Sequence, residues 1–99
     1  LLNMFRVSIL LLLVVASYAL GNVKSVTVTQ DKSLEKLFIE IKDDKSCTKG
    51  YTITSEHQIY IRVRTLAFAA KGAEKNLEIL KDTHLTKDGY CKIQYITMN

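Results

Sequence analysis

Alternating apolar and polar positions predict extended segments through the middle of the chain. The segment VKSVTVT is rich in β-branched residues, and in LFIEIK the apolar Leu37, Ile39 and Ile41 share one face. The run IYIRVR alternates most clearly, and polar clusters separate the segments. The predicted strands are residues 23–29, 37–42, 51–54 and 59–64, and the predicted turns are 30–33, 43–46 and 55–58.

Helix-forming residues dominate from Thr65 to Lys81. Ala73, Leu77 and Leu80 follow one another at i, i+4 and i+7, the spacing of an amphipathic helix. A glycine inside a helix costs about 1 kcal/mol, so Gly72 is expected to divide the helical region in two.

A last strand is predicted at residues 90–97 (YCKIQYIT), after the turn signal Asp88-Gly89. In it Cys91, Ile93 and Tyr95 share one face, which predicts that the sulfur of Cys91 is buried. The complete pattern predicts an α+β fold: a small antiparallel sheet of four to five strands, one amphipathic helix near the C-terminal end and one disulfide.

The first residues have the three parts of a cleavable signal peptide. Met4-Phe5-Arg6 is a short basic region, and the run VSILLLLVVA that follows is apolar except for Ser8. Small residues then precede two candidate cleavage points, ahead of Leu20 and ahead of Asn22. The expected division is residues 1–21 as signal peptide, with 1–3 as leader ahead of the start methionine, and 22–99 as a single small secreted domain.

The alternative for the N-terminal segment is an uncleaved membrane anchor. The apolar stretch from Val7 to Leu20 is shorter than the roughly 20 residues that span a bilayer, which favours cleavage. No second run reaches this length, and the chain does not end in a KDEL-type retention signal. We therefore expect no membrane association after cleavage, and a location outside the cell or in the endoplasmic reticulum lumen.

Cys47 and Cys91 are the only cysteines. In an oxidising compartment two cysteines most simply form one bridge, and closing a loop of about 45 residues is worth about 4 kcal/mol on the chain-entropy model. A domain this small needs such help to fold. Two free thiols, or a pair between two molecules, remain the alternatives.

Charge argues against a nucleic-acid partner. Fourteen basic and ten acidic residues give a net charge of +4, and removal of Arg6 with the signal peptide lowers it to +3. The lysines alternate with acidic residues along the chain, whereas a nucleic-acid site would gather them into a stripe with stacking aromatics. An unidentified protein partner is the expectation.

Residues for common catalytic chemistry are missing, and we expect no catalytic, cofactor-binding or metal site. His57 and His84 fall in predicted turns and lack the spacing of zinc ligands. A bridge would remove the thiol that a cysteine nucleophile needs. Asp43 and Asp44 are adjacent and should point to opposite sides, so they do not form an acid/base pair. No asparagine lies in an N-x-[ST] sequon.

The segment LFIEIKDDKSCTKG around Cys47 resembles the opening of secretory-pathway FKBP-type peptidyl-prolyl isomerases. Gly89-Tyr90-Cys91-Lys92, running into the last strand, is similar to the context of that family's second cysteine, which pairs with the first. The resemblance implies an antiparallel sheet wrapped over one short helix. The family's F-D-x-S, V-I-x-G-W and A-x-G-Y-G segments have no counterpart, so activity is not carried over.

These observations predict a small secreted non-enzymatic protein that acts through binding, with the exposed aromatics Tyr51, Tyr60 and Tyr90 as candidate contacts. The alternative is a truncated or degenerate FKBP-like luminal isomerase. A third interpretation is a partly artefactual reading frame in which only the signal segment is a real module.

Overall fold

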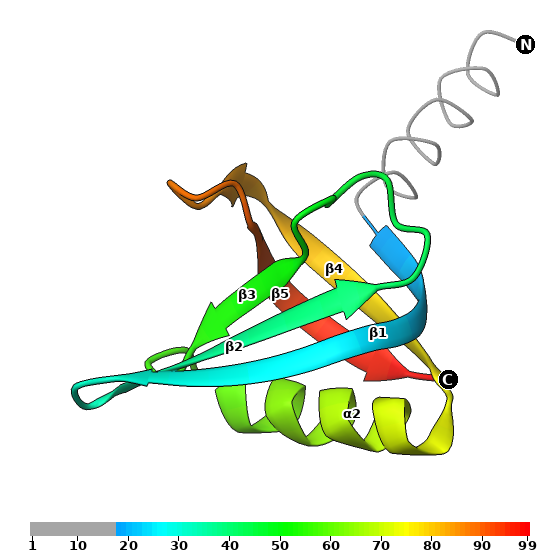
Figure 1. The fold of residues 1–99 in the computed structure, drawn as a ribbon, viewed down its shortest axis with the longest axis horizontal. Helices are drawn as coiled ribbons and strands as arrows, with labels where there is room; N and C mark the ends of the chain where they lie inside the picture. The colour runs from blue at the N-terminus through cyan, green and yellow to red at the C-terminus, as the bar shows by residue number, and fades with distance from the viewer. Residues whose placement is uncertain (1–17) are drawn as a thin grey trace, which may run out of the picture.

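Five strands form a closed barrel, and one helix packs against it (Figure 1). This computed structural model describes residues 18–99, except for the side chains of Thr83 and His84. Most of the expected signal peptide, and the alternative anchor, therefore lie outside the described residues. The elements are β1 (Tyr18–Asp31), β2 (Leu34–Ile41), β3 (Tyr51–Thr54), α2 (Tyr60–Ala73), β4 (Asn76–Leu85) and β5 (Cys91–Met98).

The strand order around the barrel is β1-β2-β3-β5-β4, and β4 returns to β1. All neighbouring pairs are antiparallel except β3 and β5, so the sheet is mixed rather than wholly antiparallel. The long β1 closes the ring: its first five residues pair with β4, its remainder pairs with β2, and the register shifts between Val23 and Ser25. Figure 1 shows β1 curving around the barrel. This order, with the helix between the third and fourth strands, is the topology of the OB-fold, a five-stranded Greek-key barrel.

The α+β class, a single helix among residues 18–99, and the Cys47–Cys91 disulfide are confirmed. Both sulfurs lie in the core, with Cys47 5% and Cys91 2% exposed. The bridge ties the loop after β2 to the first residue of β5, beside the pairing of Tyr51 with Cys91 and a hydrogen bond from the Cys91 amide to the Gly50 carbonyl (3.0 Å).

The strand predicted at residues 59–64 is wrong, because this segment forms the first half of α2. The buried residues of the helix are Tyr60, Val63, Ala67 and Ala70, which are spaced for one helical face. The alternating apolar residues of 59–64 do not all lie on this face, since Ile61 is 70% exposed. The segment also has no strand to pair with, because a closed barrel leaves no free sheet edge.

The helix predicted across residues 73–81 is also wrong beyond Ala73. Glu74 adopts a left-handed conformation (φ 55°) that ends α2, and the Lys75 amide donates to the Ala70 carbonyl. The chain then enters β4, in which Leu77 and Ile79 alternate into the core. Pairing with both β1 and β5 outweighs the helical propensity of this segment.

In β5 the first part of the predicted face is correct, and Cys91 and Ile93 are buried. Tyr95 is not: it is exposed, and Ile96 is buried instead. The register with β4 shifts here, since Leu80 pairs with Tyr95 and Lys81 with Ile93. The extra residue is a β-bulge that reverses the alternation.

Candidate functional site

A half-buried aromatic pair marks the most distinctive surface of the barrel. The ring centroids of Phe38 and Tyr90 lie 5.0 Å apart at an interplanar angle of 56°. Phe38 projects from the middle of β2, where it pairs with Thr52 of β3, and Tyr90 directly precedes β5. A hollow beside the rings, here called the aromatic face, is lined by Lys36, Phe38, Thr52, Thr54, Thr86, Asp88 and Tyr90.

A second hollow continues this surface. It is lined by Thr52, Ile53, Thr54, His57, Thr86, Lys92 and Ile93, so the two hollows share their threonines. Thr52 is buried, and its hydroxyl donates to the Leu37 carbonyl at 3.0 Å. Together the hollows form a surface of aromatic and aliphatic carbon with hydroxyl groups and a few charges around it.

The loop that carries Tyr90 is held by several contacts. The Thr86 amide donates to the Tyr90 carbonyl (2.9 Å), and the Tyr90 amide donates to the Thr86 hydroxyl (3.0 Å). Gly89 takes a positive φ of 85°, a conformation in which a side chain would be strained. The Lys49 ammonium donates to the Asp88 carbonyl at 2.6 Å, and the disulfide fixes the residue after Tyr90. The ring of Tyr90 is therefore positioned before any ligand arrives.

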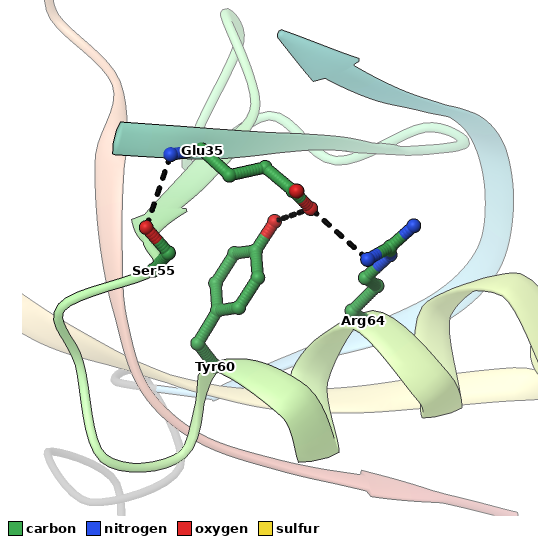
Figure 2. A network of polar contacts seen from close by, with 4 residues as sticks. All are labelled: Glu35, Ser55, Tyr60 and Arg64. Atoms are coloured by element: carbon green, nitrogen blue, oxygen red, sulfur yellow. Dashed lines mark hydrogen bonds and ion pairs between the residues drawn. The ribbon is translucent and has the colours of Figure 1, made fainter. Parts of the chain in front are cut away.

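Apart from the aromatic face, a network of polar side chains lies where β2 meets the helix (Figure 2). The Tyr60 hydroxyl donates to Glu35 Oε1, which also forms an ion pair with Arg64 at 3.2 Å. The Glu35 amide donates to the Ser55 hydroxyl at 3.0 Å. Burial, and then the adjacent carboxylate, raise the pKa of Tyr60 to about 12. Because Tyr60 stays protonated at neutral pH, it cannot act as a base there. The contacts of Tyr60 and Arg64 with Glu35 instead hold α2 against β2.

Tyr51 and Asp44 form a similar contact on the loop after β2. Burial and the hydrogen bond that Tyr51 donates to Asp44 raise the pKa of Tyr51. Burial opposes ionisation of Asp44, but hydrogen bonds from Tyr51 and Ser46 outweigh it and lower the pKa of this carboxyl. Asp43 does not join the contact and has a left-handed backbone (φ 61°).

The structure separates the three tyrosines suggested by the sequence. Tyr51 is fully buried and Tyr60 is 3% exposed, so neither is available to a partner. Tyr90 is partly exposed and belongs to the aromatic face. Phe38 was missed, although a signal was present: it is a large apolar residue on the otherwise polar side of a strand whose inner face is Leu37, Ile39 and Ile41.

The two histidines lie on different elements. His57 lies in the turn before α2, where its ring accepts a hydrogen bond from the Ile59 amide (3.2 Å), and it borders the second hollow. His84 lies in β4, not in a turn. Among the described side chains, which exclude His84, no group of three or more His, Cys, Asp or Glu is placed to hold a metal ion. No described helix is long and apolar enough to cross a membrane.

Comparisons with protein families, with curated proteins and with solved structures return no match for this chain.

Proposed function

We propose that this chain is a small non-enzymatic binding protein of the secretory pathway, and that its ligand is an oligosaccharide that binds on the aromatic face. The observation that carries the proposal is the Phe38–Tyr90 pair, which is partly exposed and held in place beside a hollow. Aromatic rings usually contribute to a protein by being buried in its core. Phe38 and Tyr90 are instead partly exposed and line a hollow, so a ligand can contact both rings.

The chemistry of the surface supports a sugar. The face of an aromatic ring is electron-rich and attracts the weakly positive C–H bonds of a pyranose. The hydroxyl groups of Thr54 and Thr86, and the charged groups of Lys36 and Asp88, can exchange hydrogen bonds with sugar hydroxyls. In proteins with OB topology the face of strands 2 and 3, with the adjoining loops, binds oligosaccharides or oligonucleotides, which is an analogy of fold only.

Single-stranded nucleic acid is the less suitable ligand of the two. It requires a groove of positive charge that follows the phosphates, with successive stacking rings. The aromatic face has one ring pair, and its charged lining residues are of both signs, Lys36 and Asp88.

The test uses the oxidised secreted protein on a panel of immobilised oligosaccharides, followed by titration of the strongest hit. Phe38→Ala and Tyr90→Ala should each weaken binding at least tenfold, the loss expected for an aromatic anchor at about 1.4 kcal/mol or more. Phe68→Ala is the matched control, because Phe68 is an exposed aromatic on the helix. No saturable binding to any sugar, or equal losses in all three variants, would refute the proposal, as would tighter binding to a single-stranded oligonucleotide.

The alternative is an FKBP-like luminal prolyl isomerase. Its support is the resemblance around the two cysteines, whose bridge is formed. A proline-peptide isomerisation assay separates the two proposals, since a rate above background would favour the isomerase.

A further inference from the structure

The first five residues of β1 close the barrel. Tyr18 to Asn22 pair in antiparallel register with residues 80 to 76 of β4, and β1·β4 is the seam that completes the ring of five strands. Two candidate cleavage points for the signal peptide, ahead of Leu20 and ahead of Asn22, lie inside this seam.

Small residues occupy the inward positions of this segment. Ala19 is 6% exposed and belongs to the core, while its neighbours Tyr18 and Leu20 point outward, with 41% and 62% exposed. At Gly21 an added Cβ would lie 2.8 Å from Cγ2 of Ile41, closer than a side chain tolerates. The Ala-Leu-Gly sequence, which looks like a peptidase recognition pattern, is therefore also the pattern that barrel closure requires.

Cleavage ahead of Asn22 would remove most of the seam. Of the five residue pairs between β1 and β4, only that of Asn22 with Asn76 would remain. Leu77 and Ile79 of β4 are fully buried and lie opposite Gly21 and Ala19, so they would face a missing strand. The backbone of β4 would also become an open sheet edge.

We propose that signal peptidase cuts on the amino side of Tyr18, so that the secreted protein keeps the whole of β1. The sequence pattern alone favours the points ahead of Leu20 and Asn22, and it is the seam that moves the proposed cut toward the N-terminus. Of the bonds on that side, Ser17–Tyr18 has the small Ser17 immediately before it and Val15 two positions earlier, at the end of the apolar run. Water adds across this bond and leaves a carboxylate on Ser17 and a free amino group on Tyr18. The inference rests on the proposed secretion of the chain.

The first experiment is expression of the full chain, with a C-terminal tag, in secreting eukaryotic cells. Intact mass and N-terminal sequencing of the secreted protein should place its first residue at Tyr18; a start at Ser17 also keeps β1 and supports the proposal. A start at Leu20 or Asn22 would overturn it and leave secretion intact. A chain that is neither cleaved nor secreted would overturn the secretory proposal as well.

A matched pair of variants tests the choice of bond without depending on folding. Signal peptidase requires a small residue just before the cut, so Ser17→Leu should block processing at Tyr18, whereas Gly21→Leu should leave it unchanged. The N-terminus is read on tagged chain immunoprecipitated from inside the cells, so a variant that misfolds still reports its cleavage. Blocked processing in Gly21→Leu, with normal processing in Ser17→Leu, would refute the proposed site.

Discussion

Removal of the disulfide should cost this domain much of its stability. Cys47 and Cys91 are separated by 44 residues, and the chain-entropy relation for a loop of this size gives about 13 cal/mol/K, or about 4 kcal/mol at 25 °C. Small domains are commonly stable by about 5–15 kcal/mol, so the loss approaches the lower limit of that range. For a domain of this size it corresponds to a fall of about 15–30 °C in Tm.

The appropriate variant is Cys47→Ala/Cys91→Ala, because a single substitution would leave a free thiol able to join two molecules. Urea unfolding followed by far-UV circular dichroism measures the free energy, with Thr48→Ala as a control in the same loop that should stay within about 0.5 kcal/mol of the parent. A loss below about 1 kcal/mol would refute the reasoning. It would show that the Tyr51–Cys91 strand pairing and the hydrogen bond from Cys91 to Gly50 hold this corner without the bridge.

The remaining predictions concern two glycines and a tyrosine. Gly50→Ala should destabilise by more than about 2 kcal/mol in urea unfolding, since φ is 107° and the new Cβ would lie 2.6 Å from the Ile39 carbonyl oxygen; parental stability would contradict this. Gly72→Ala should stabilise by about 0.5–1 kcal/mol, because it lies in α2 with nothing within 4 Å of the added carbon, and any loss would count against that assignment. Burial and the Glu35 carboxylate raise the pKa of Tyr60 from 10.0 to about 12, so its contribution is present below pH 10 and is lost as pH rises toward 12. The free energy of unfolding measured from pH 9 to 12 should therefore fall less steeply in Tyr60→Phe than in the parent, and identical slopes would exclude this role.

Local pattern was sufficient for the elements whose partners are close in sequence or whose alternation is regular. β3 was predicted to its ends, β2 was predicted at 37–42 and begins three residues earlier at Leu34, and the turn at Gly89 followed from residue type. The bridge followed from the number of cysteines, because two thiols have only one way to pair within a chain. For β5 the burial of Cys91 was also correct.

The errors lie where tertiary pairing overrides local preference. Residues 59–64 alternate like a strand, yet their helical face becomes visible only when Ala67 and Ala70 are counted with Tyr60 and Val63. Residues 76–81 favour a helix by composition and become a strand between β1 and β5. The sequence of a few neighbouring residues cannot predict that the barrel closes, nor that a bulge in β5 turns Tyr95 outward, because both depend on pairing with distant strands.

The candidate site depends on the same distinction. The sequence alone was enough to expect an α+β chain with a signal segment, one bridge and an available Tyr90, because these follow from residue types and short-range spacing. It did not place Phe38 beside Tyr90, and it did not show that Ala19 and Gly21 belong to the barrel. Those relations exist only between strands that are distant in the chain. The pairing of β3 with both β2 and β5, together with the bridge, brings Phe38 to Tyr90, and the pairing of β1 with β4 places Ala19 and Gly21 in the barrel.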